Sequence, residues 1–98
     1  MRKERFGTMR RDPKTGSVKV IFVDGYADDF TFCYYKLGSK WHAIVRDYGL
    51  SIAMANTRKD VAAAARRSID KLREYERING ESMRQLFLEK AREAATIE

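Results

Sequence analysis

Apolar and polar residues alternate along the first half of the chain with the two-residue period of a half-buried β-strand. Ser17–Val23 is apolar at successive positions, as expected of a central strand that is covered on both faces. Aromatic residues, which favour strands, dominate the next segment. The pattern predicts strands at Phe6–Arg11, Ser17–Val23, Phe30–Leu37 and Trp41–Asp47, whereas Leu50–Ala55 fits either a short edge strand or the approach to a helix.

Turn signals separate these segments. Asp12-Pro13-Lys14-Thr15-Gly16 predicts a hairpin loop, because proline presets the backbone of a type I turn and glycine supplies the positive φ that follows. Asp24–Asp29, Gly38-Ser39 and Tyr48-Gly49 predict further turns. Short connections of this kind join consecutive strands into an antiparallel sheet.

The hydrophobic period changes from that of a strand to that of a helix after residue 56. Thr57 is a suitable N-cap, and Asn79-Gly80 is a typical helix stop. The spacing between them predicts one amphipathic helix over residues 58–78, with Val61, Ala62, Ala65, Ile69, Leu72 and Tyr75 on its apolar face. A second helix follows, with Met83, Leu86, Phe87, Lys90, Ala91 and Ala94 along one face.

Together the elements predict an α+β single domain, an antiparallel sheet of about four strands followed by two C-terminal helices. Within residues 1–98, we expect a basic arm and the first hairpin strand at 1–16, the sheet at 17–55 and a helical hairpin at 57–96. The helices would cover one sheet face. Because the first strands are apolar on both faces, a partner or a second copy is expected on the other face, which makes a homodimer plausible.

Composition indicates one globular domain, with 98 residues of which 44% are hydrophobic and 35% charged. The single cysteine, Cys33, cannot form an internal disulfide, so a reducing, cytoplasmic setting fits best. No apolar run approaches the roughly 20 residues needed to cross a bilayer. The N-terminus lacks the apolar segment of a signal peptide, so we expect an intracellular protein without membrane contact.

Positive charge is concentrated in two places. The formal net charge is +6, from 20 Lys+Arg and 14 Asp+Glu. Residues 1–16 carry +4, residues 17–56 are neutral, and residues 57–98 carry +2. A basic arm and a basic helix beside a neutral sheet suit a protein that binds something negative, either nucleic acid or an acidic protein surface.

Arginine and lysine side chains in these two places are the candidate contacts. Lys59, Arg66 and Arg73 are spaced by seven residues, opposite the apolar face of the predicted helix, and the planar guanidinium suits phosphate or carboxylate. The alternatives are an ordinary solvated helix face supported by an Arg66–Asp70 pair, and an arm whose charges protect an edge strand. The full set of candidate binding residues is Arg10, Arg11, Lys59, Arg66, Arg67, Arg73 and Arg77.

Side chains that would form a catalytic or metal site do not assemble from the sequence. The single histidine, His42, lies in a predicted strand with no nucleophile motif near it, and Cys33 lies among aromatic residues. Asp24, Asp28 and Asp29 do not have the spacing of a calcium-binding loop and are interpreted as turn residues. We expect no catalytic residues, no metal and no cofactor.

Aromatic residues of the predicted sheet have two interpretations. They could stack on unpaired bases, as the aromatic sheets of RNA-binding folds do. Because the sheet is neutral and these residues alternate with apolar ones, packing in the core or at an interface is favoured. The residues are Tyr26, Tyr34, Tyr35, Trp41 and Tyr48.

Trp41, Arg46 and the alanine-rich helix to Leu72 stand where plant ethylene-response-type DNA-binding domains and the arm-binding domains of phage integrases keep similar residues, so residues 40–72 resemble those families. The strand-to-helix junction around Thr57 is similar to that of HicB-type antitoxins. The pair Arg58-Lys59 resembles a basic pair at the last helix of double-stranded-RNA-binding domains. Each resemblance covers about a third of the chain without a diagnostic motif, so the sequence assigns no family.

Two functions are compatible with these observations. The first is a small non-enzymatic nucleic-acid-binding accessory protein that contacts the phosphates of DNA or RNA through the arm and the basic helix face. The second is a protein-interaction module, such as a mobile-element-encoded inhibitor or an antitoxin-like protein that blocks a larger nucleic-acid-processing complex through an acidic patch. Charge alone leaves both open.

Overall fold

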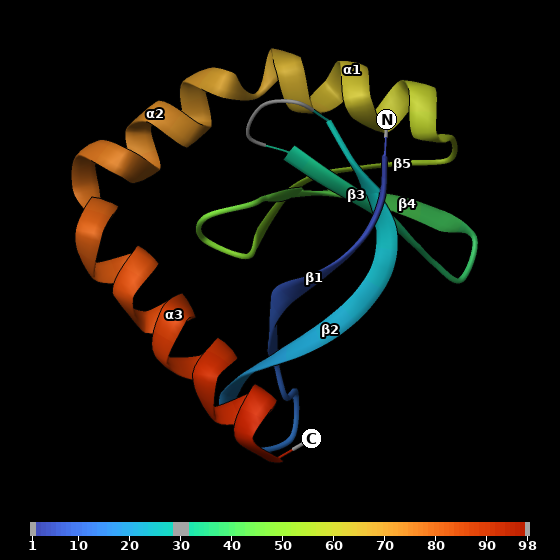
Figure 1. The fold of residues 1–98 in the computed structure, drawn as a ribbon. Helices are drawn as coiled ribbons and strands as arrows, with labels where there is room; N and C mark the ends of the chain where they lie inside the picture. Colours follow the sequence, from blue (N-terminus) through green and yellow to red (C-terminus); the bar gives the residue numbers. More distant parts are fainter. Residues whose placement is uncertain (1, 29–31, 98) are drawn as a thin grey trace.

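The computed structural model describes residues 2–28 and 32–97, and within them five strands precede three helices (Figure 1). The strands pair consecutively and antiparallel in one sheet. The predicted α+β class and the order of strands before helices are confirmed. The elements are β1 (Arg2–Arg11), β2 (Val18–Ala27), β3 (Phe32–Leu37), β4 (Lys40–Val45), β5 (Leu50–Ala55), α1 (Arg58–Arg67), α2 (Ile69–Ile78) and α3 (Gly80–Ile97).

Element counts in this described part differ slightly from the expectation of about four strands and two helices. Leu50–Ala55 is a strand, which settles the alternative left open by its sequence. The helix expected over residues 58–78 is divided into α1 and α2 at Ser68. The predicted stop at Asn79-Gly80 is confirmed, because α2 ends at Ile78 and α3 begins at Gly80.

β1 and β2 form a long two-stranded ribbon. Their pairing runs from Arg2 opposite Ala27 to Arg11 opposite Val18. β1 therefore begins four residues before Phe6, and most of the expected basic arm is a strand. β2 continues into the expected turn at residues 24–29, of which residue 29 lies outside the described part.

Beyond its short pairing with β3, the ribbon bends away from the other strands and crosses over them (Figure 1). In the described residues, β2 pairs with β3 at Tyr26–Tyr34 and Ala27–Cys33. Gly25 lies where the two strands separate, and a Cβ atom there would stand 2.2 Å from the backbone oxygen of Tyr34. The absence of a side chain at residue 25 thus permits the close backbone approach.

Both faces of the β3–β4–β5 part of the sheet are covered within the chain. α1 and α2 cover one face, where Val61, Ala65 and Leu72 pack on a cluster that includes Tyr34 and Val45. The ribbon covers the other face, and its residues there are Phe6, Val23 and Ala27, packed against Cys33, Tyr35 and Ile44. The expectation that a partner or second copy covers this face is wrong, because the curled ribbon supplies the apolar side chains itself.

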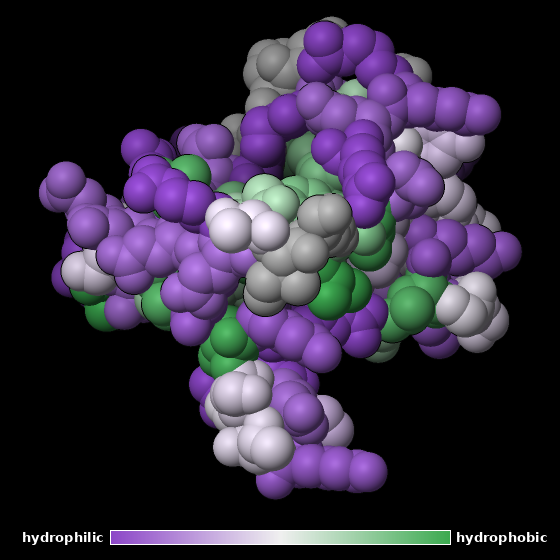
Figure 2. Space-filling view, turned by 60° about the horizontal axis from the view of Figure 1, so that its bottom comes forward, coloured by the Kyte–Doolittle hydropathy of each residue, from purple (hydrophilic) through white to green (hydrophobic). Residues whose placement is uncertain are grey.

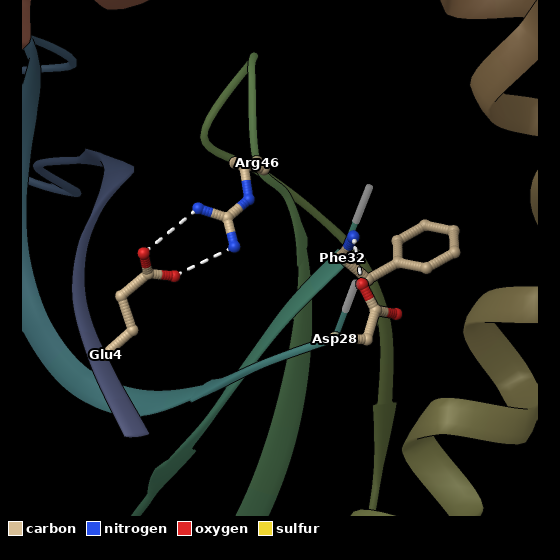
Figure 3. A network of polar contacts seen from close by, with 4 residues as sticks. All are labelled: Glu4, Asp28, Phe32 and Arg46. Carbon is tan, nitrogen blue, oxygen red and sulfur yellow. Dashed lines mark hydrogen bonds and ion pairs between the residues drawn. The ribbon is translucent and has the colours of Figure 1, made fainter. Parts of the chain in front are cut away.

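β1 also reaches the turn between β4 and β5, which nearly closes the sheet on itself. The backbone N–H of Met9 donates to the carbonyl of Gly49 (2.8 Å), and the Thr8 hydroxyl donates to the same oxygen (3.1 Å). At the other end of β1, the Arg46 guanidinium contacts the Glu4 carboxylate through two nitrogen atoms at 2.8 and 3.2 Å (Figure 3). The contact from Nη1 to Oε1 has the geometry of a hydrogen bond, and the Nη2–Oε2 contact is an ion pair.

Acid should weaken the contact between Glu4 and Arg46. The hydrogen bond from Arg46 holds the pKa of Glu4 below its ordinary value of 4.5, against the opposing effect of burial. A carboxyl group whose pKa is lowered by folding stabilises the fold above its unfolded pKa, and that stability is lost as pH falls through the folded pKa. In urea titrations from about pH 6 to about pH 3, the wild type should therefore lose more stability than the Glu4→Gln variant. The same pH dependence in both proteins would contradict this.

The break at Ser68 turns the helical chain around the sheet. Ser68 has φ −92° and ψ 9°, and its carbonyl accepts bonds from the N–H groups of both Lys71 and Leu72, so one tight turn separates two α-helices. Figure 1 shows α1 lying over the sheet and α2 and α3 descending along one side of it. None of the described helices is long and apolar enough to span a membrane.

α3 is attached to the sheet through Phe87. In the described part of this helix, Phe87 is the one buried side chain. Its ring lies against Gly7 of β1 and Gly49 of the β4–β5 turn, where an added Cβ would come within 3.4 and 2.4 Å of ring atoms. Gly49 also has φ +63°, which side chains rarely adopt. These two glycines leave the space that the ring fills.

Candidate cationic binding surface

The predicted binding residues of α1 are exposed and without ionic partners. Lys59 and Arg66 lie two helical turns apart on one flank of the helix, and Arg67 points away from the buried Val61 and Ala65. Within residues 2–28 and 32–97, no ion pair involves Lys59, Arg66 or Arg67. Three full positive charges are therefore available to an outside partner.

The predicted binding residues of α2 are partly neutralised inside their own helix. Arg73 lies 3.7 Å from Asp70, and Arg77 contacts Glu74 at 2.5 Å. The expected pair between Arg66 and Asp70 is replaced by this Asp70–Arg73 contact. Because the chain bends at Ser68, the seven-residue spacing does not produce one straight stripe from α1 to α2.

Arg10 and Arg11 lie at the far end of the molecule from α1. They end β1 beside the ribbon loop, at the bottom of Figure 1, whereas α1 is at the top. Arg10 is half-buried and donates to the hydroxyl of Tyr35 (3.2 Å), while Arg11 is exposed. Figure 2 brings this end forward and shows mostly hydrophilic residues with separate hydrophobic patches. Arg10 and Arg11 thus do not form one continuous surface with α1.

Other cations come close to α1 instead, around the ring of Tyr26. The Arg58 guanidinium carbon lies 4.4 Å from the centre of that ring, and the Trp41 ring lies 6.0 Å away. Lys3 is directly opposite Tyr26 in the ribbon, and Lys36 is directly opposite Trp41 in the β3–β4 pair, so each shares a sheet face with its partner. We call Lys3, Tyr26, Lys36, Trp41 and Arg58 the aromatic–cation cluster.

None of the three cations of this cluster was among the candidate binding residues from the sequence, although Arg58 was named there in a resemblance to RNA-binding domains. The set comes from β1, β2, β3, β4 and α1, and strand register and the N-terminus of α1 bring it together. Tyr26 and Trp41 are half-buried, whereas Tyr34, Tyr35 and Tyr48 are buried in the core. A groove of about 520 Å³, lined by Lys3, Glu4, Arg5, Asp24, Gly25 and Tyr26, adjoins the cluster.

Two acidic groups near this surface, Asp28 and Glu4, have structural partners. The carboxylate of Asp28 accepts a hydrogen bond from the backbone N–H of Phe32 (3.2 Å; Figure 3), which ties together the ends of the β2–β3 turn. It also accepts one from the hydroxyl of Tyr34 (3.0 Å). Burial and then this bond raise the pKa of Tyr34. Glu4 is held by Arg46. Asp28 and Glu4 therefore support the fold beside the cations.

His42 and Cys33 are packed in the sheet. The His42 ring stacks on Tyr35 at 5.2 Å, and burial followed by the charge of Arg10 lowers its pKa. Cys33 is fully buried, and burial raises the pKa of its thiol to about 11. Among the residues that the structure describes, no three His, Cys, Asp or Glu side chains are grouped to hold a metal ion.

No protein-family model, curated protein or solved structure is a significant match to this chain.

Proposed function

We propose that this protein is a small non-enzymatic nucleic-acid-binding protein that contacts phosphates through α1. The observation that carries the proposal is the set of exposed, unpaired cations Lys59, Arg66 and Arg67. Lys3, Lys36 and Arg58 add exposed positive charge beside the N-terminus of the same helix. An excess of unpaired cations on one side of a molecule of net charge +6 attracts a polyanion.

Binding of this kind depends on salt more than on sequence. Each cation that neutralises a phosphate releases condensed counterions, so the logarithm of the affinity falls linearly with the logarithm of the salt concentration. Contacts to phosphates position the protein on the strand without reading its bases. We expect α1 to make the main contact and α2 to contribute less, because Arg73 and Arg77 already have acidic neighbours.

Neutralising the unpaired cations should therefore flatten the salt dependence. In a double variant with Lys59→Gln and Arg66→Gln, the slope of log affinity against log salt concentration should become less steep by about 2, roughly one for each lost phosphate contact. The matched control is Arg73→Gln with Arg77→Gln, which removes the same formal charge and should change the slope less. The slopes are obtained from affinities measured by fluorescence anisotropy between about 50 and 200 mM salt, and the two double variants are then compared.

Two results would count against the proposal. An equal slope change in both double variants would show that α1 has no special part in binding. No binding to duplex DNA, single-stranded DNA or duplex RNA at about 50 mM salt would exclude the nucleic-acid function altogether. The unpaired cations of α1 would then be assigned to an acidic protein surface, as in an inhibitor of a larger complex.

A further inference from the structure

We infer that the aromatic–cation cluster binds an unpaired base, so that the protein prefers single-stranded to duplex nucleic acid. This inference rests on the proposed function and assigns its substrate class. The base would stack on the exposed side of the Arg58 guanidinium, which lies over the ring of Tyr26. Neighbouring lysines would contact the phosphates on either side of that base.

The Arg58–Tyr26 pair provides the flat surface. The guanidinium carbon lies over the ring, 4.4 Å from its centre, within the range of a cation–π contact. Arg58 is exposed, while the Tyr26 ring beneath it is half-buried and supported by Trp41 at 6.0 Å. Bases in single-stranded nucleic acid stack on aromatic rings and on arginine planes. A ring that holds the guanidinium in place reduces the conformational freedom lost on binding.

Charge around the flat surface matches a nucleotide chain. Lys3 and Lys36 are exposed and lie on the same sheet faces as Tyr26 and Trp41, respectively. Asp24 also lines the adjoining groove, and in the ribbon it is opposite Arg5. Lys59, on the next position of α1, extends the positive charge towards Arg66. The phosphates on either side of a stacked base could contact these cations. An acidic peptide could pair with the same cations through its carboxylates, but it has no planar base to stack on the guanidinium.

Duplex nucleic acid cannot use this surface in the same way. Its bases are stacked on each other and paired inside the helix, so their faces are not available to Arg58. A duplex would contact the cations of α1 through phosphates alone. The two substrate classes should therefore respond differently to changes in the cluster.

A pair of probes with equal charge separates base stacking from phosphate contact. The first is an oligothymidylate of about 12 nucleotides, and the second is an abasic deoxyribose-phosphate oligomer of the same length. We expect the wild type to bind the oligothymidylate about ten-fold more tightly, the effect of stacking roughly one base. Trp41, the single tryptophan, offers a fluorescence signal within the cluster.

Arg58→Lys keeps the charge and removes the plane, so it is the decisive variant. It should lose the preference for the oligothymidylate while its affinity for the abasic oligomer, its affinity for duplex DNA and its salt slope stay unchanged. Arg84→Lys is the matched control, because Arg84 also lies over an aromatic ring, that of Tyr48 at 5.7 Å, but belongs to α3 and not to the proposed surface, and it should keep the preference. Tyr26→Leu should behave as Arg58→Lys does, and circular dichroism shows whether that variant is folded.

Failure of this inference and failure of the proposed function give different results. Equal affinity of the wild type for both oligomers would overturn base stacking and leave phosphate binding intact. An unchanged preference in Arg58→Lys would also overturn the assigned surface. No binding of either oligomer or of duplex DNA would overturn the proposed function as well.

Discussion

Replacing Phe87 by alanine is expected to lower the free energy of unfolding by about 3–5 kcal/mol, the usual cost of removing a buried phenylalanine ring. The ring fills the space between Gly7, Gly49 and Val20, and two of these residues have no side chain that could move into the cavity. For a chain of this length that loss is a large part of a total stability of about 5–15 kcal/mol. Urea denaturation followed by circular dichroism measures it.

The effect should centre on α3, since no other described side chain of this helix is buried. Hydrogen exchange should show faster opening of α3 than of the β3–β4 pair. Leu88→Ala is the matched control, because Leu88 is the next residue and is 53% exposed, and its stability should stay within about 0.5 kcal/mol of the wild type. If the two variants were equally stable, Phe87 would not anchor the helix.

Replacing Gly25 by alanine should have the second large effect, a loss of about 3 kcal/mol in the free energy of unfolding. The new Cβ would stand 2.2 Å from the backbone oxygen of Tyr34, and no side-chain rotation can relieve a contact between two backbone-fixed atoms. β2 would have to move away from β3 where the ribbon leaves the sheet. Thermal and urea denaturation of the variant test this.

Gly80→Ala provides the comparison for Gly25→Ala, because a Cβ at residue 80 meets no atom within 4 Å and Gly80 has no positive φ. It should leave the free energy of unfolding unchanged or raise it by about 0.5 kcal/mol, as expected for alanine in a helix. If Gly25→Ala were as stable as Gly80→Ala, that result would contradict the close approach of β2 to β3 at residue 25. Gly25 also precedes Tyr26, so nucleic-acid binding by a folded Gly25→Ala variant would show whether a shift of β2 disturbs the aromatic–cation cluster.

Local sequence signals located most elements because their causes are local. Thr57 is the N-cap of α1, and its hydroxyl accepts a hydrogen bond from the N–H of Asp60 (3.1 Å), as the sequence pattern indicated. The ribbon loop closes through Asp12, whose carboxylate accepts from the N–H of Lys14 (2.8 Å). Alternation and helical spacing were sufficient to predict the α+β class.

Two local expectations failed because tertiary contacts outweighed local propensity. DGYADD contains strong turn residues, yet its first four residues extend β2, since Tyr26 and Ala27 pair with β3. The helical pattern over residues 58–78 has no glycine or proline, yet it breaks at Ser68. The break allows α2 to place Leu72 in the core after α1 has placed Ala65 there.

The sequence by itself determined the class of the fold, the positions of most of its turns and the excess of positive charge, because these depend on neighbouring residues and on composition. The tertiary structure alone decided which charges meet. Arg10 and Arg11 are separated from α1 by the length of the ribbon, whereas Lys3 is paired in the ribbon with Tyr26, over whose ring Arg58 lies. Strand register and the curl of the ribbon set these distances, and both arise from pairing and packing between residues remote in the chain.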